Sequence, residues 1–126
     1  MNIPAELRYS SDHEWVRVDG ATATIGITEY AQDALGDVVF VEMPDTGLAV
    51  AAGESFSEVE STKSVSDIYA PITGAIAEVN AELESQPELL NSDPYGAGWI
   101  CRIAISDPSE LDGLMDADAY RALTEG

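Results

Sequence analysis

The stretch that decides the fold reads Val59-Glu60-Ser61-Thr62-Lys63-Ser64-Val65-Ser66-Asp67. Short segments rich in β-formers predict strands over residues 55–61 and 65–70, with Thr62 and Lys63 between them. Lys63 is the only lysine among 126 residues, and the other four basic residues are arginines. Arginine supplies charge and hydrogen bonds but cannot replace a primary amine that must be acylated. Lys63 is therefore either a chance surface residue or a residue retained for its chemistry.

The composition around this stretch is strongly acidic. Five basic residues stand against 24 acidic ones, which gives a net charge of −19. Nucleic acids and anionic membrane surfaces are excluded as partners because binding to them needs a basic face. Two tryptophans, five tyrosines and 45% hydrophobic residues indicate a packed core rather than disorder. The acidic surplus therefore predicts the surface of a halophilic protein, whose self-repulsion is screened by salt.

The length and the apolar runs predict one cytoplasmic domain over residues 1–126. The longest apolar runs, at 38–41 and 48–52, are too short to span a bilayer. The start of the chain lacks the pattern of a secretory signal. A single cysteine excludes an internal disulfide and fits a reducing compartment.

Turn signals divide the rest of the chain into short elements. A hairpin is expected over residues 15–25, with its turn at Asp19-Gly20. Thr28 is expected to cap a short helix that stops at Gly36, and a buried strand should follow over residues 38–41. Further expectations are a turn at 71–74, strands over 75–79 and 99–105, and one helical turn at 87–90.

The C-terminal part of the chain predicts helices. Asp107-Pro108-Ser109-Glu110 has the pattern of a capping box with proline at the first helical position. A last helix over residues 116–123 should dock Tyr120 and Leu123 on the core. Short strands with helices at the flanks favour a small antiparallel sandwich or barrel.

The residues needed for independent catalysis are scarce. His13 is the only histidine, which excludes histidine-based metal clusters. Cys101 lies in a predicted strand, where a free cysteine usually fills the core. The glycines are scattered through turns and form no phosphate-binding loop. A stand-alone enzyme is therefore not expected.

The lysine segment, with Ala70-Pro71-Ile72-Thr73-Gly74 after it, resembles the lysine hairpin of lipoyl domains. Biotin domains share this fold but flank their lysine with methionines, whereas Thr62 and Ser64 favour lipoate. Four further segments narrow the resemblance to the glycine cleavage system H protein over essentially the whole chain. They are Tyr9-Ser10-Ser11-Asp12-His13-Glu14-Trp15-Val16, Ala23-Thr24-Ile25-Gly26-Ile27-Thr28, Ala31-Gln32 with Leu35-Gly36-Asp37-Val38-Val39-Phe40-Val41, and Leu90-Asn91 with Pro94-Tyr95-Gly96-Ala97-Gly98-Trp99.

The resemblance implies a mostly β, flattened barrel-sandwich hybrid of the lipoyl/biotinyl type with short flanking helices. The lipoyl-type core would cover about residues 22–104, with C-terminal helices over about 107–124. Lipoate would be attached covalently to Lys63 by a lipoate ligase or a lipoyl/octanoyl transferase. The chain would be a monomeric, non-catalytic carrier whose swinging arm serves partner enzymes.

The implied partners are three enzymes of glycine catabolism. A pyridoxal-phosphate-dependent decarboxylase, the P protein, would leave the aminomethyl group of glycine on the arm. An aminomethyltransferase, the T protein, would pass its carbon to a folate-type carrier and release ammonia. A flavin- and NAD-dependent dihydrolipoyl dehydrogenase, the L protein, would reoxidise the dithiol.

Four further site residues are expected beside Lys63. Glu60 and Gly74 would help the modifying enzyme recognise the hairpin, Gly74 by serving a turn that glycine enters easily. Glu14 and Asp67 would dock the cationic amine of the loaded arm in a sheltered cleft.

Two departures from the family pattern and two other functions complete the predictions. Ala34 replaces a histidine of some relatives and would alter the pocket of the arm, whereas Arg102 replaces a lysine and should be neutral. An H-like relay that donates lipoyl groups to other complexes is an alternative, as is an unmodified interaction module.

Overall fold

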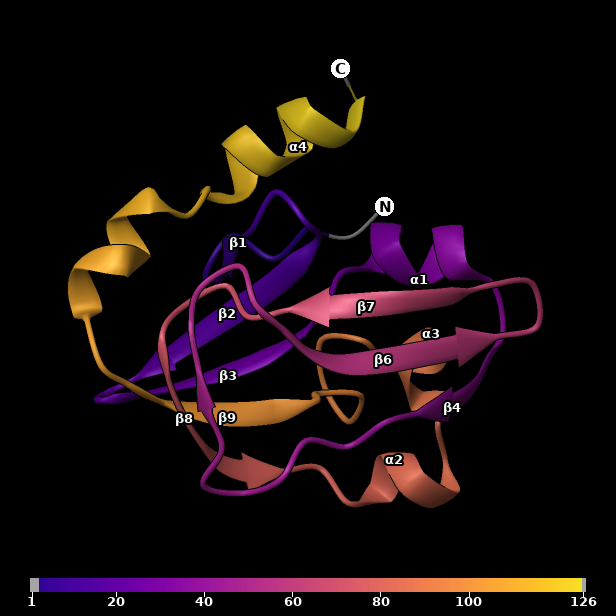
Figure 1. Cartoon of the computed structure of the whole chain (residues 1–126). Coiled ribbons are helices and arrows are strands. Elements are labelled where there is room, and N and C mark those ends of the chain that lie inside the picture. The colour runs from indigo at the N-terminus through magenta and orange to yellow at the C-terminus, as the bar shows by residue number, and fades with distance from the viewer. Residues whose placement is uncertain (1–2, 126) are drawn as a thin grey trace.

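Across residues 3–125, which the computed structural model describes, nine strands form two antiparallel sheets (Figure 1). The larger sheet has the order β1-β2-β3-β9-β8-β5, and the smaller one has the order β4-β6-β7. The larger sheet contains β1 (Arg8–Tyr9), β2 (Glu14–Asp19), β3 (Thr22–Ile27), β5 (Ala49–Val50), β8 (Gly74–Val79) and β9 (Cys101–Ile105). The smaller sheet contains β4 (Val38–Val41), β6 (Ser55–Ser61) and β7 (Val65–Tyr69). The predicted mostly β architecture is confirmed.

Both predicted hairpins are present. In the β2–β3 hairpin, Asp19 pairs with Thr22, so Gly20 and Ala21 form the turn, one residue later than expected. Gly20 has φ +63°, a conformation that glycine adopts without steric cost. In the β6–β7 hairpin, Glu60 pairs with Val65, which leaves Lys63 within the connection. This hairpin forms two of the three strands of the smaller sheet.

The helices are short. Helix α1 (Glu29–Leu35) begins and ends as predicted, because the Thr28 hydroxyl accepts a hydrogen bond from Ala31 N–H (3.2 Å) and Gly36 ends the helix with φ +83°. Helices α2 (Glu82–Ser85) and α3 (Leu89–Ser92) lie between β8 and β9, where only one helical turn was expected. The chain ends with the 3₁₀ helix η1 (Pro108–Gly113) and helix α4 (Ala117–Glu125).

Three predictions about side chains were wrong because distant neighbours decide them. Strand β4 is not buried throughout: Val39 and Phe40 are 54% and 50% exposed on an edge strand with a bulge. Glu110 does not complete a capping box; its carboxylate instead accepts hydrogen bonds from the amide (2.7 Å) and hydroxyl (2.9 Å) of Thr73. Tyr120 is buried as predicted, but Leu123 is 47% exposed.

The core consists of two clusters. The larger cluster joins the inward faces of both sheets, with Ile25, Val59 and Ile103 fully buried within it. The smaller cluster packs Tyr120 of α4 against Tyr9 and Trp15 of the larger sheet. The Tyr9 and Tyr120 rings stack 4.6 Å apart at an angle of 11°. Helix α4 is therefore held to the sheet by aromatic packing.

Candidate functional site

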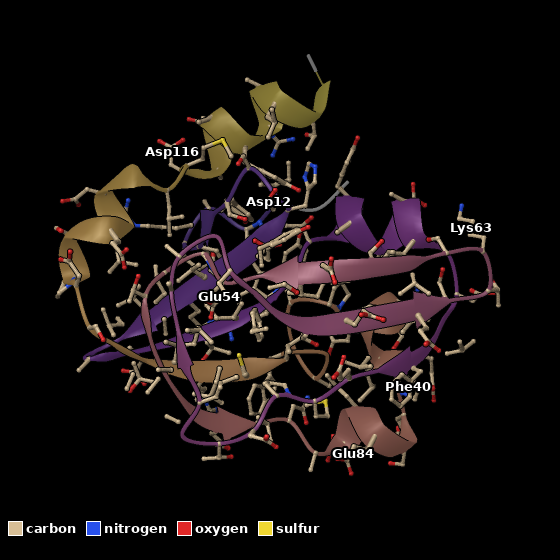
Figure 2. All side chains as sticks on the ribbon, viewed as in Figure 1. Asp12, Phe40, Glu54, Lys63, Glu84 and Asp116 are labelled. Atoms are coloured by element: carbon tan, nitrogen blue, oxygen red, sulfur yellow. The ribbon has the colours of Figure 1, made fainter. Side chains whose placement is uncertain are left out.

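Lys63 lies at the exposed free end of the β6–β7 hairpin (Figure 2). Ser61 holds the connection closed: its N–H donates to the Ser64 carbonyl (2.8 Å), and its hydroxyl accepts from the Ser64 N–H (3.1 Å). The Lys63 side chain passes close to Gly36. A Cβ added to Gly36 would lie 3.0 Å from the Lys63 Cε. A fixed turn therefore presents a primary amine on a flexible stem.

The hairpin tip is tied to the connection between α1 and β4. The Thr62 N–H donates to the Asp37 carbonyl (3.0 Å). Asn91 of α3 fixes the same connection, because its Oδ1 accepts from Val38 N–H (2.8 Å) and its Nδ2 donates to the Gly36 carbonyl (2.8 Å). Sequence reasoning noted Asn91 only as part of a motif and missed this positioning role. A polar residue directly after the buried Leu90 was the available signal.

A cavity of about 220 Å³ lies between α1 and β7, beside the hairpin. We call it the α1–β7 cavity. Its lining residues are Asp12, His13, Ile27, Tyr30, Ala31, Ala34, Leu35, Ser66, Asp67 and Ile68. The wall is mainly apolar, and Asp12 and Asp67 contribute two carboxylates to it. This combination suits a long apolar group with a cationic end. Ala34 is part of this wall, at the place where the sequence predicted an altered pocket.

His13 connects the α1–β7 cavity to the C-terminal helix. Its Nδ1 lies 2.8 Å from the Tyr120 hydroxyl, which lies 2.7 Å from the Thr28 hydroxyl at the start of α1. The His13 backbone has φ +70°, which is uncommon for a residue other than glycine. Burial lowers the pKa of His13, so the imidazole is neutral at pH 7. Sequence reasoning missed both His13 and Asp12 as cavity residues.

The two predicted docking carboxylates have different surroundings. Asp67 is exposed and lines the α1–β7 cavity, whereas Glu14 is not among the described residues that line it. Glu14 is 1% exposed and accepts a hydrogen bond from the Ser10 hydroxyl (2.6 Å). Burial raises the pKa of Glu14 to about 7, only partly offset by the Ser10 hydrogen bond. The structure therefore brings one carboxylate of the expected pair to the cavity.

The two predicted recognition residues also differ. Glu60 is exposed on β6, three residues before the lysine. Gly74 is buried at the start of β8, and its φ is not in the left-handed region, so the expected turn is not its reason for being glycine. An added Cβ would lie 2.6 Å from the Ile103 Cγ2 and closer still to the Ala104 carbonyl oxygen. Close packing of β8 on β9 therefore requires glycine there.

The thiol of the single cysteine is shielded from solvent. Cys101 is buried, and burial raises the pKa of its thiol to about 12, so it is not a nucleophile at neutral pH. No cluster of three potential metal ligands occurs among the side chains that the structure describes.

A wider hollow of about 520 Å³ on the larger sheet is lined by Arg17 and Arg102. Arg17 donates to the Tyr95 carbonyl (2.8 Å), and Arg102 forms an ion pair with Glu78 (2.7 Å). Asp19 also lines the hollow, so its two guanidinium groups are balanced by two carboxylates.

No helix in the described part of the chain is long and apolar enough to cross a membrane.

Comparisons with known proteins extend along the whole chain. A family described as "Glycine cleavage H-protein" matches residues 7–126. The glycine cleavage system H protein of Symbiobacterium thermophilum is 56% identical over 124 residues, covering 98% of this chain and 97% of the relative. A probable glycine cleavage system H protein of Haloarcula marismortui is 56% identical over 120 residues, covering 95% and 94%.

A solved structure agrees with the fold. The crystal structure of a glycine cleavage system H protein from Mycobacterium marinum has a TM-score of 0.90 and 42% sequence identity, covering 98% of this chain and 100% of that chain. Sequence and three-dimensional arrangement thus lead to the same conclusion, and the chain belongs to the glycine cleavage H-protein family.

Proposed function

We propose that Lys63 is the residue through which this carrier holds lipoate and moves the aminomethyl group of glycine from the P protein to the T protein. Proteins of the family are non-catalytic carriers with lipoate bound covalently to a lysine. The observation that carries the proposal is the exposed tip position of the only lysine in the chain. The L protein is the third expected partner, as the enzyme that restores the oxidised arm.

The chemistry of attachment explains why this residue is a lysine. The Lys63 Nζ attacks the carbonyl carbon of an activated lipoyl donor, such as the adenylate made by a lipoate ligase. The amide C–N bond forms, the leaving group departs with its electron pair, and the nitrogen loses a proton to solvent. A guanidinium group is too weak a nucleophile for this step. A lipoyl/octanoyl transferase would use a thioester donor in the same way.

The α1–β7 cavity supports a second role, which is to shelter the loaded arm. Lipoate supplies the sulfur atoms that accept the aminomethyl group, whose amine is cationic and exposed to hydrolysis. Asp67 and Asp12 at the cavity can pair with a cation, and the apolar wall of Ile27 and Leu35 excludes water. Because His13 is neutral, it does not repel the cation.

The first prediction is that Lys63→Arg abolishes carrier activity and leaves the fold intact. The side chain is exposed, so the free energy of unfolding should change by less than about 0.5 kcal/mol. Glycine-dependent CO₂ exchange with the P protein measures the activity, and urea unfolding measures stability. Ser64→Ala, at the neighbouring tip position, is the control and should keep its activity. Exchange at the wild-type rate in Lys63→Arg would refute the proposal.

The second prediction concerns the two expected docking carboxylates. Asp67→Asn should leave lipoylation unchanged but accelerate the loss of formaldehyde and ammonia from the loaded protein. The exposed Asp45→Asn is the matched control, and Glu14→Gln, alone and combined with Asp67→Asn, tests the second carboxylate. Equal release rates in wild type and Asp67→Asn, at the same salt, would remove Asp67 from the mechanism.

We also propose that Glu60 takes part in recognition by the modifying enzyme. The exposed position of Glu60 before the tip supports this proposal. Normal lipoylation of Glu60→Ala by a ligase would disprove the recognition role.

We further propose that the carrier works as a monomer and that it belongs to the cytoplasm of a salt-adapted cell. The net charge of −19 supports the habitat, and the single buried cysteine supports the location.

A further inference from the structure

Exposed apolar side chains gather at one end of the smaller sheet. Among the described residues, the three most exposed large hydrophobic side chains are Val65 (57%), Val39 (54%) and Phe40 (50%). Val39 and Phe40 lie on β4, and Val65 begins β7 directly after the hairpin tip. Isolated surface hydrophobics need no explanation, but a group on one sheet end indicates a binding surface.

The strand register places this group around Glu60. Phe40 of β4 pairs with Glu60 of β6, and Glu60 pairs with Val65 of β7. Residues that pair across strands share a face, so one row across the whole sheet reads apolar, acidic, apolar. The next β6 residue inward, Val59, is fully buried, which assigns this row to the outer face. We call Val39, Phe40, Glu60 and Val65 the tip strip.

The tip strip lies within reach of any enzyme that handles the lysine itself. Lys63 follows Glu60 by three residues and precedes Val65 by two. Figure 2 shows Lys63 and Phe40 at the same end of the molecule. The hairpin tip is fixed by the Ser61–Ser64 and Thr62–Asp37 hydrogen bonds, so the strip and the lysine are presented together.

We infer that the tip strip is the docking surface of the enzyme that forms the amide at Lys63, an inference that rests on the proposed attachment there. That enzyme must bring an acyl donor to bonding distance of Nζ, so its surface must cover residues beside the tip. Enzymes that act on the far end of the arm have no need to approach Nζ itself. The partner surface that fits is an apolar patch divided by a cationic side chain facing Glu60.

The strongly acidic surface explains why apolar groups are needed for recognition. One carboxylate among 24 acidic residues does not distinguish the hairpin from the rest of the chain. High salt also weakens exposed ion pairs, whereas apolar contact persists. Phe40 and Val65 on either side of Glu60 therefore provide the specificity that charge alone lacks.

The test uses the full apo-protein with a lipoate ligase, ATP and lipoate. Phe40→Thr/Val65→Thr removes the apolar groups and keeps β-branched residues that suit strands. Val18→Thr, 43% exposed on the other sheet, is the matched control. Mass spectrometry follows attachment, and calorimetry gives the Kd for the ligase. For the double variant we expect KM and Kd to rise about tenfold, typical of losing an interface anchor, with kcat within about twofold. Val18→Thr should match wild type.

The outcomes separate this inference from the proposed function. Unchanged KM and Kd in the double variant, or an equal change in Val18→Thr, would overturn the docking surface while attachment at Lys63 stands. A normal KM for attachment with a weakened interaction between lipoylated carrier and P protein would also overturn it, by assigning the strip to that enzyme. The docking surface would also be overturned if the wild type formed a dimer and the double variant did not, because the strip would then join two copies of the chain. Absence of attachment to wild-type Lys63 would instead refute the proposed function. Thermal unfolding of both variants checks that they fold.

Discussion

Glu14 is the only acidic side chain that the fold buries within residues 3–124. Burial raises its pKa from 4.5 to about 7, so the folded state binds this proton more tightly than the unfolded chain does. The protonated form therefore contributes stability below pH 4.5, and this contribution is lost as the pH rises through 7. A glutamine has the same shape and no such titration.

The third prediction follows from this pKa. Relative to Glu14→Gln, wild type should lose about 2–3 kcal/mol of unfolding free energy between pH 5 and pH 8. Urea unfolding at each pH measures the difference between the two proteins, which removes the effect of the other acidic groups. The exposed Glu60→Gln serves as control and should show a much smaller change. Parallel pH curves for wild type and Glu14→Gln would show that Glu14 ionises normally in the folded protein.

Single residues differed in how far the sequence could predict them. The position of Lys63 in a hairpin connection could be predicted because the turn around it is formed by neighbouring residues; its role as the attachment site stays a prediction. The presence of Asp12 and His13 at the α1–β7 cavity could not be predicted, because the opposite wall comes from α1 and β7, which are distant in the sequence. Gly74 was expected to serve a turn, but its φ is not in the left-handed region, and glycine is required there by the close approach of Ile103 on a neighbouring strand.

At the scale of elements, Tyr120 joins the last helix to the first. Its ring stacks on Tyr9, and its hydroxyl lies between His13 Nδ1 (2.8 Å) and the Thr28 hydroxyl (2.7 Å). Thr28 caps α1, which forms one wall of the α1–β7 cavity. Packing of α4 therefore supports the start of α1.

The fourth prediction is that Tyr120→Phe lowers the free energy of unfolding by about 1–3 kcal/mol. The change keeps the ring stack but leaves the buried Thr28 hydroxyl and His13 without their shared partner. Urea unfolding at pH 7 measures the loss. Tyr30→Phe, at a side chain that is 37% exposed, is the matched control and should lose much less. Equal losses in both variants would contradict the role of the Tyr120 hydroxyl.

Residues close together in the sequence predicted the helices and hairpins, whereas contacts between distant residues decided hydrogen-bond partners and exposure. The Thr28 cap and the two hairpins depend on residues a few positions apart, so the sequence was sufficient for them. The pairing of Glu110 with Thr73 spans 37 positions, and the exposure of Phe40 depends on β4 being an edge strand. Periodicity within one segment contains no information about such partners.

At the scale of the whole molecule, negative charge is almost unopposed. The net charge is −19, with five basic residues against 24 acidic ones, and one of the basic residues, Arg102, pairs with Glu78. The two side chains of this pair are 42% and 54% exposed, so it stabilises the fold little. Repulsion among the acidic groups is therefore a general destabilising effect.

The fifth prediction is that salt stabilises the protein. Raising NaCl from 0.1 M to 1 M shortens the Debye length from about 10 Å to about 3 Å. The thermal midpoint should rise by at least about 4 °C, the shift that about 1 kcal/mol produces in a domain of this size. Calorimetry at the two NaCl concentrations measures the midpoint. An unchanged or lower midpoint at 1 M NaCl would contradict charge repulsion as the cause.

The chain belongs to a family of lipoyl carriers, and its fold is compatible with the proposed attachment at Lys63. The two sheets present the hairpin, Asn91 and Asp37 fix its surroundings, and the chain has a single lysine for the arm. The most direct test is mass spectrometry of the intact protein and its peptides from the native host, beside Lys63→Arg expressed in the same host. We predict one lipoyl amide on Lys63 in wild type and none in the variant. A wild-type protein without the adduct, or an adduct that persists in Lys63→Arg, would contradict the account.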